Sequence, residues 1–149
     1  MLMKPDMEKH LHNQAGFTLL ELMIAIVLMT IAVFAVINLQ VVAIRSNGIA
    51  NGLSSATALA ETVLDNMMSL DVSDAKINTN ATNIPANHID PANPNATSIT
   101  VPGAGTYSAT YTTLVGTSAN GVPSNVTKIT VTATGGGHTV TICGFKRTV

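Results

Sequence analysis

The chain has 149 residues, of which 46% are hydrophobic, 10% are charged and 3% are aromatic, and its formal net charge is -1. This length suits one domain, while the low charge and a mean hydropathy of +0.37 argue against both an intrinsically disordered chain and an ordinary soluble domain. The single cysteine, Cys143, excludes an intramolecular disulfide, and the sequence contains no basic cluster of the kind that marks nucleic-acid binders.

A short polar stretch, residues 1–16, precedes an apolar run over residues 17–37. The run is interrupted only by Thr18, Glu21 and Thr30. As a helix it would span roughly 30 Å, the thickness of bilayer hydrocarbon, which is longer than the apolar core of a secretory signal peptide. Basic residues lie mainly before the run, and Arg45 is the only one in the thirty residues after it. This asymmetry predicts a cytoplasmic N-terminus and an exported remainder.

Glu21 is the residue that a plain membrane anchor does not explain. It lies five positions into the apolar run, with no basic residue within one helical turn. An ionised carboxylate in hydrocarbon costs several kcal/mol unless it finds a partner. The partner must therefore come from another molecule or from an amine newly created beside it.

The string GFTLLE at residues 16–21, behind a polar leader and ahead of an apolar helix, resembles the class III signal of type IV pilins and of the pseudopilins of type II secretion. The resemblance implies that a membrane-embedded prepilin peptidase cuts between Gly16 and Phe17 and that the new N-terminus at Phe17 is methylated. It also implies that Glu21 neutralises the Phe17 amine of a neighbouring subunit, so that two groups costly in the membrane are relieved only by assembly. Residues 1–16 would then be a cleaved leader.

The helical pattern is expected to continue beyond the membrane. Residues 17–39 form its transmembrane and assembly half, and residues 40–70 form an amphipathic half. The apolar stripe of this second half comprises Leu53, Ala56, Ala60, Val63, Met67 and Leu70. A continuous helix would be about 80 Å long, and Gly48 and Gly52 are the positions where we expect any bend or local melting. The Met67 and Met68 pair is expected to fill the core.

Residues 71–106 are expected to connect the helix to a sheet. The part from Asn78 to Ser98 is dense in Asn, Pro, Ala and Thr and is interpreted as a loop, a plausible place for a binding surface. Asp71, Asp74 and Asp90 could offer oxygen ligands to calcium, but their spacing matches no known loop motif, so no metal is expected. Three glycosylation sequons predict exposure rather than glycans: those at Asn80, Asn95 and Asn125.

Residues 107–149 are expected to form an antiparallel sheet of three or four strands. The strands are expected over residues 107–115, 126–134 and 139–145. Alternation places aliphatic residues on one face of the last two: Ile129, Val131, Ala133, Val140 and Ile142. Three glycines, 135–137, form a hairpin connection, and Val101 belongs to a short extra strand. The fold class is therefore α+β and pilin-like, with the sheet packed on the helix around Val63 and Met67.

Enzymatic chemistry is not expected. His88 lies in the loop, His138 follows the glycines at a turn, and both are interpreted as solvated. Cys143 has no histidine close by in the sequence and should lie on the face opposite Val140 and Ile142, as an inert thiol. No catalytic residue and no cofactor is therefore predicted.

The leading hypothesis is a structural subunit of a type IV pilus-like filament. The stretch 56–70, ATALAETVLDNMMSL, resembles the stem of PilV-like minor pilins and of the small secretion pseudopilins related to them. A minor pilin is favoured, a type II secretion pseudopilin is the alternative, and a membrane-anchored extracytoplasmic binding domain comes third. The resemblance implies several partners: other pilin or pseudopilin subunits, prepilin peptidase, an inner-membrane assembly platform, and membrane lipid before assembly. The filament would lie at the cell surface, or in the periplasm as a pseudopilus.

Overall fold

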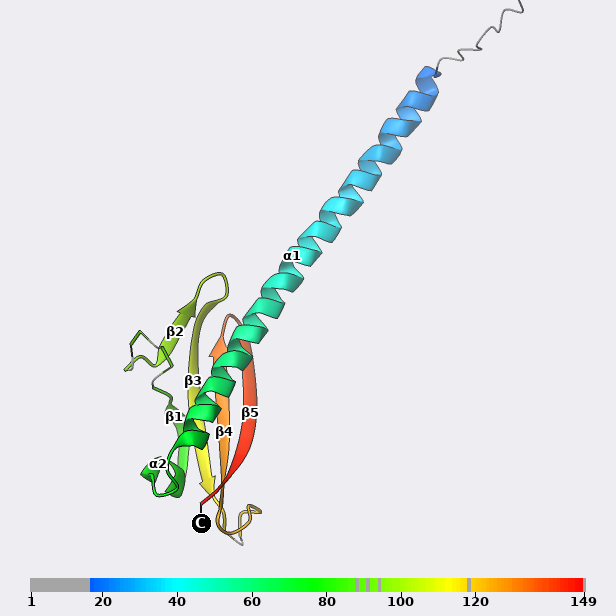
Figure 1. The fold of residues 1–149 in the computed structure, drawn as a ribbon. Coiled ribbons are helices and arrows are strands. Elements are labelled where there is room, and N and C mark those ends of the chain that lie inside the picture. Colours follow the sequence, from blue (N-terminus) through cyan, green and yellow to red (C-terminus); the bar gives the residue numbers. More distant parts are fainter. Residues whose placement is uncertain (1–16, 88, 91, 94, 118, 149) are drawn as a thin grey trace, which may run out of the picture. The chain divides into compact units, whose positions relative to one another are not determined.

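The structure is a computed structural model that describes residues 17–87, 89–90, 92–93, 95–117 and 119–148. The chain divides into two compact units, residues 1–42 and residues 43–149, and each is described by itself. The helices are α1 (Leu19–Ser69) and α2 (Ala75–Asn78), and the strands are β1 (Ala81–Pro85), β2 (Ser98–Val101), β3 (Gly105–Val115), β4 (Val126–Gly135) and β5 (His138–Arg147) (Figure 1).

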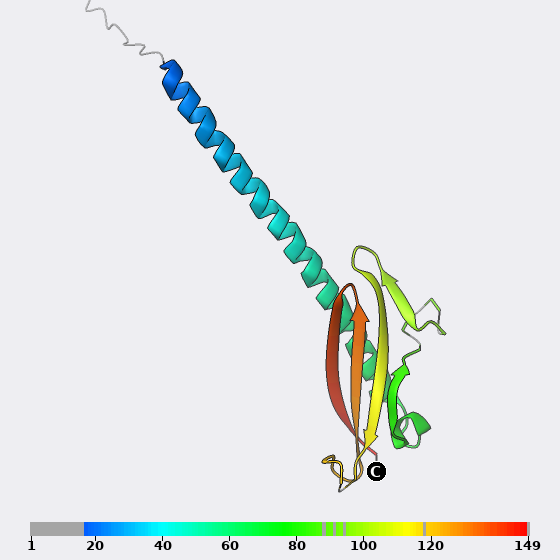
Figure 2. The ribbon, with the colours of Figure 1, turned by 180° about the vertical axis from the view of Figure 1, so that it is seen from behind.

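In the second unit, the C-terminal part of α1 packs on an antiparallel sheet. The strand order is β1-β3-β4-β5, and β2 pairs with the same edge of β3 as β1 does. Figure 2 shows the face of this sheet that is turned away from α1. The expected α+β fold, with a long N-terminal helix and a C-terminal antiparallel sheet, is confirmed. The sheet has five strands, where three or four were expected.

The three long strands lie where alternation predicted them. β3 and β4 pair through nine residues, and β4 and β5 pair through ten. The connection between β4 and β5 is a two-residue turn at Gly136 and Gly137, whose φ angles are 57° and 79°. Positive φ at both central positions defines a type I′ hairpin turn, so the predicted glycine hairpin is confirmed.

The segment for which a connecting loop was expected contains α2, β1 and β2, so the interpretation of Asn78–Ser98 as a loop is wrong for β1. Polar contacts with β3 organise this short strand. The Ala86 N–H donates to the Ala109 carbonyl at 2.8 Å, and the Thr113 hydroxyl donates to the Thr79 carbonyl at 2.8 Å. These long-range contacts, rather than an apolar pattern, define the strand. The short extra strand predicted around Val101 is confirmed as β2.

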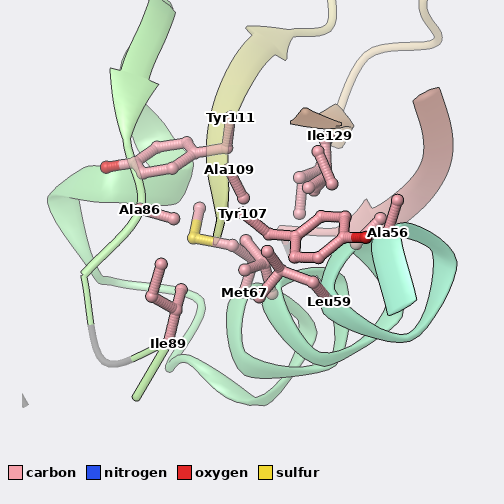
Figure 3. Close-up of a cluster of buried hydrophobic side chains, with 13 residues drawn as sticks. Ala56, Leu59, Met67, Ala86, Ile89, Tyr107, Ala109, Tyr111 and Ile129 are labelled. Atoms are coloured by element: carbon pink, nitrogen blue, oxygen red, sulfur yellow. The ribbon is translucent and has the colours of Figure 1, made fainter. Parts of the chain in front are cut away.

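The core lies between α1 and the inner face of the sheet. Figure 3 shows Leu59 and Met67 of α1 pointing toward Tyr107 and Ala109 of β3. The predicted stripe is largely confirmed, because Ala56, Ala60, Val63 and Met67 are buried and Leu70 packs against them at the edge of the core. One of its members is wrong, because Leu53 is 47% exposed while Gly52 and Leu59 are buried in its place. The separate expectation that Met67 and Met68 both fill the core is confirmed for Met67 and wrong for Met68, which is 38% exposed.

α1 stays helical through Gly48 and Gly52, so the local melting expected at these glycines is absent. Gly52 faces the sheet, where the His138 ring and the Tyr107 hydroxyl lie against it. A Cβ atom at Gly52 would lie 2.9 Å from the His138 Cδ2, whereas one at Gly48 would meet nothing within 4 Å. Gly52 is therefore a packing position and not a weak point of the helix.

The outer face of the sheet is covered with hydroxyl side chains. Neighbouring threonines contact each other across strands, with 3.1 Å between the Oγ1 atoms of Thr132 and Thr141 and 3.4 Å between those of Thr134 and Thr139. The hydroxyl residues of this face on β3, β4 and β5 are Thr106, Ser108, Thr110, Thr112, Thr130, Thr132, Thr134, Thr139 and Thr141. We call this set the hydroxyl face.

Candidate processing and assembly site

The first turn of α1 is built on Thr18, which acts as the N-cap. Its Oγ1 accepts a hydrogen bond from the Glu21 N–H at 3.2 Å, and its carbonyl accepts one from the Leu22 N–H at 3.2 Å. Threonine at the N-cap and glutamate three residues later is the sequence pattern of a capping box. The local sequence therefore begins the helix at Leu19, immediately after the Thr18 cap.

Glu21 lies in this first turn and is exposed. The N-terminal end of a helix carries a partial positive charge from its free N–H groups, which favours a carboxylate at this position. Phe17 precedes the helix and is 84% exposed. Phe17 and Glu21 thus flank the N-cap, at the same end of the helix. Gly16, the expected last residue of the leader, lies outside the described residues, as does the rest of that leader.

The helix that follows presents an apolar surface on all sides. An 18-residue window of α1 has a mean hydropathy of 2.8 and no buried residue, so by length and composition α1 is able to cross a membrane. Thr30 interrupts the apolar surface, but its hydroxyl donates to the Val27 carbonyl at 2.7 Å. A hydroxyl satisfied within its own helix adds little cost in hydrocarbon. Glu21 is then the charged group in this segment that needs an external partner.

Of the histidines and the cysteine considered for catalysis, the structure describes His138 and Cys143, which lie on opposite faces of β5. His138 is the first residue of β5 and packs over Gly52, so it is half-buried rather than solvated as expected. Cys143 is exposed on the outer face of β5, the face predicted for it. His88 lies outside the described residues.

The three aspartates considered as calcium ligands are used locally. Asp71 accepts hydrogen bonds from the Ser73 hydroxyl and N–H at 2.6 and 2.8 Å, which lower its pKa below the ordinary value of 3.8. Asp74 caps α2 through the Lys76 N–H at 2.8 Å. Asp90 accepts from the Ala92 N–H at 2.9 Å. Within the described ranges, no three His, Cys, Asp or Glu side chains gather into a metal-binding group.

Two polar groups with clear structural roles were not assigned by the sequence analysis. The first is Thr18, treated there only as an interruption of the apolar run, although the Thr-x-x-Glu pattern would have identified it as a cap. The second is Lys146, whose ammonium donates to the Met68 and Leu70 carbonyls at the end of α1. The sequence carries no local signal for this contact, because the residues are 78 and 76 positions apart.

Comparison with known proteins identifies the N-terminal segment. Residues 11–37 match the family described as prokaryotic N-terminal methylation motif. No curated protein and no solved structure matches the chain. The matched segment contains Phe17, Thr18, Glu21 and most of the apolar surface described above.

This motif is the class III prepilin signal, and it indicates the type IV pilin and pseudopilin family, whose members are structural rather than enzymatic. It implies, in general terms, processing by prepilin peptidase and assembly with other pilins. Together with the apolar helix, it indicates a protein of the inner membrane before assembly and of a filament afterwards.

Proposed function

We propose that this chain is a minor pilin, a structural subunit of a type IV pilus-like filament that assembles through its apolar N-terminal helix. The observation that carries the proposal is the exposed Glu21 carboxylate in the first turn of α1, whose N-terminal part is otherwise apolar and unburied. No basic residue lies within a helical turn of it in the sequence. In hydrocarbon, such a group is stable only beside a positive charge from elsewhere.

Cleavage between Gly16 and Phe17 would supply that charge. Hydrolysis of the peptide bond leaves a carboxylate on Gly16 and a free amine on Phe17, and a methylated amine keeps its positive charge. Glu21 of one subunit then neutralises the Phe17 amine of a neighbour. The Thr18 cap supports this scheme, because it holds the start of the helix, and therefore both groups, at one end. The same scheme places residues 1–16 in the cytoplasm and the sheet outside it.

The narrower choice of a minor pilin depends on the similarity of residues 56–70 to PilV-like stems. A type II secretion pseudopilin is the alternative, since related pseudopilins carry a similar stem. The two functions differ in what is lost when the gene is deleted: surface pili and their functions for a minor pilin, or export of secreted enzymes for a pseudopilin. The genes that neighbour this one provide a second criterion.

Mass spectrometry of the mature protein tests the processing step. We expect a chain that begins at Phe17 and carries the added mass of one methyl group. In cells that lack prepilin peptidase, the chain should keep residues 1–16. A mature protein that still begins at Met1, or one cut within residues 32–35, would overturn the proposal.

Replacement of the carboxylate tests the assembly step. Glu21→Gln keeps the shape of the side chain and removes its charge, so the variant should insert in the membrane and be processed. Its amount in sheared filaments should fall at least about tenfold, which corresponds to roughly 1.4 kcal/mol. Glu61→Gln removes an exposed carboxylate from the other half of α1 and is the matched control. If the native chain is absent from sheared filaments and Glu21→Gln leaves sorting and function intact, a membrane-anchored binding domain is favoured instead.

A further inference from the structure

The sheet has two edges of different character, both within the second unit (Figure 2). One edge is formed by β1 and β2, which are short, and β1 ends in Pro85 and has a register shift between Ala81 and Ile84. The other edge is β5, which pairs with β4 through ten residues without a register shift and contains no proline. Proteins usually protect edge strands by proline, bulges, short length or charge. β5 has none of the first three.

The lysine of β5 does not protect this edge, because its ammonium contacts backbone carbonyls at the end of α1. The ammonium of Lys146 donates to the carbonyls of Met68, in the last turn of α1, and of Leu70, just after α1, and Arg147 is the last residue of the strand. From His138 to Phe145 the strand contains no Asp, Glu, Lys or Arg. This stretch is therefore free to pair with another extended chain.

The hairpin turn determines which backbone groups of β5 are free. In a two-residue hairpin the pair beside the turn, here Gly135 and His138, exchanges both backbone hydrogen bonds, and every second pair does the same. The intervening residues of β5, which include Thr139, Thr141 and Cys143, direct N–H and C=O groups away from β4. The short distance between the hydroxyls of Thr141 and Thr132 agrees with the close spacing of such non-hydrogen-bonded pairs.

β2 has the direction and the side chains that fit this edge. β2 is antiparallel to β3, and β5 is parallel to β3, so two copies in the same orientation bring β5 of one antiparallel to β2 of the other. Both strands alternate in the same way, with half-buried aliphatic residues on the inner face and exposed residues, mostly with hydroxyl groups, on the outer face. The inner residues are Val140 and Ile142 in β5 and Ile99 and Val101 in β2; the outer ones are Thr139, Thr141 and Cys143 in β5 and Ser98 and Thr100 in β2.

We propose that the free edge of β5 pairs antiparallel with β2 of a second copy in the same orientation, with Thr141 opposite Thr100 and Cys143 opposite Ser98 of that copy. This register continues the aliphatic inner face and the hydroxyl outer face from one sheet into the next. The contact joins different surfaces of the two copies, so it is open-ended, as a filament requires. It goes beyond the proposed function and does not depend on it, because it uses only residues 98–147.

Disulfide crosslinking of the full-length chain tests both the contact and its register. Ser98→Cys gives every chain a cysteine on each edge, and residues opposite each other in a ladder have Cα atoms 4.5–5.5 Å apart, within the range for a disulfide. The variant is overproduced and oxidised while it is still in the cell membrane. The crosslinked chains are then separated on non-reducing gels. We expect a ladder of two, three and more linked chains. Chains with the native Cys143 alone, or with Ser98→Cys and Cys143→Ser together, should remain monomers.

Thr100→Cys is the register control. In the proposed register its neighbour is Thr141, and Cys143 is only diagonal to it at about 7–8 Å, so we expect at least about fivefold less crosslinking than with Ser98→Cys. Equal crosslinking from positions 98 and 100 would overturn the register. A dimer formed by native Cys143 alone would overturn the choice of partner, because it would place β5 against β5 of the second copy.

Two substitutions in the Ser98→Cys background test the strand edge itself. Thr141→Pro removes an N–H that points away from β4, which an edge strand tolerates, and should abolish the ladder. Thr141→Lys should reduce it in the same way if the proline variant does not fold. Thr110→Lys, on the outer face of β3 away from the edge, is the control and should leave the ladder intact. If Ser98→Cys stays monomeric although mass spectrometry shows normal processing at Phe17, this inference fails and the proposed function stands.

Discussion

The ammonium of Lys146, in the last strand, donates a hydrogen bond of 2.6 Å to the carbonyl oxygen of Met68, at the end of α1. The Leu70 carbonyl accepts from the same ammonium. The final carbonyls of a helix have no partner within it and carry partial negative charge, so a lysine there satisfies both needs. The last strand of the chain thereby holds the end of its first helix.

Loss of this contact should destabilise the protein. Lys146→Met keeps the apolar stem and removes the ammonium, and we expect the free energy of unfolding to fall by about 1–2 kcal/mol because charged hydrogen bonds are lost at a partly exposed position. Urea unfolding of the protein in detergent, followed by circular dichroism of the sheet, measures the change. Lys128→Met, on the outer face of β4, is the control and should change stability by less than about 0.5 kcal/mol.

Alanine substitutions at Gly52 and at Gly48 of α1 can be compared directly, because the two glycines differ in what surrounds them. Alanine at Gly48 has open space around it, so the substitution should stabilise the helix by about 0.5–1 kcal/mol. Alanine at Gly52 gains the same helix propensity but must displace His138, whose Cδ2 would lie 2.9 Å from the new Cβ. Gly52→Ala should therefore be less stable than Gly48→Ala in thermal unfolding. If His138→Ala does not remove most of this difference, the contact is not its cause.

Alanine substitutions at the two glycines of the β4–β5 hairpin turn allow a second comparison. Gly136 and Gly137 both have positive φ, which costs a residue with a side chain about 1 kcal/mol or more. A Cβ at Gly136 would also lie 2.5 Å from the Tyr107 hydroxyl and 2.9 Å from the Ala104 carbonyl oxygen, while one at Gly137 would meet nothing within 4 Å. We expect Gly136→Ala to be the more destabilising by at least about 1 kcal/mol. If thermal unfolding shows the same loss of stability for Gly136→Ala and Gly137→Ala, the Tyr107 hydroxyl moves aside at no cost in free energy.

The Asp71 carboxylate should respond to loss of its serine partner. The Ser73 hydroxyl is the largest cause of its lowered pKa, so Ser73→Ala should raise that pKa toward 3.8. Because the folded-state pKa is lowered, the associated stability is present above about pH 4 and is lost as the pH falls through the folded-state value. Carboxyl NMR titration measures the shift. Thr62→Ala, whose hydroxyl donates within α1, is the control and should leave the Asp71 titration unchanged.

The sequence predicted those parts of the fold whose side chains repeat with a regular period. β3, β4 and β5 alternate in burial along most of their length, and the expected strands differ from the observed ones by no more than two residues at either end. β1 has no such pattern, and hydrogen bonds between β3 and an Asn-rich segment define it instead. Gly52 was missed in the stripe for a related reason. A residue without a side chain gives no hydrophobic signal, although it is buried under His138.

For the candidate site, the Glu21 carboxylate within an apolar run is visible in the sequence without a structure, and Phe17 follows from the resemblance of residues 16–21 to a prepilin signal. The roles assigned to both residues stay predictions. The structure adds the Thr18 cap, which fixes where the helix begins. The contact between Lys146 and Met68 could not have been predicted, since it depends on a strand and a helix end that only the folded sheet brings together.

Ionic strength should have little effect on contacts made through the hydroxyl face. Contacts between exposed charges weaken as ionic strength rises, and at physiological salt they are screened beyond about 8 Å. Among the described residues on the outer face of the sheet, charges lie only at one end, on Lys128 and Arg147, and the threonines of the hydroxyl face occupy its centre. Interactions made through that centre use hydroxyl groups and methyl groups, which salt does not screen. Contacts made by the centre of this face would therefore have a strength that depends little on ionic strength.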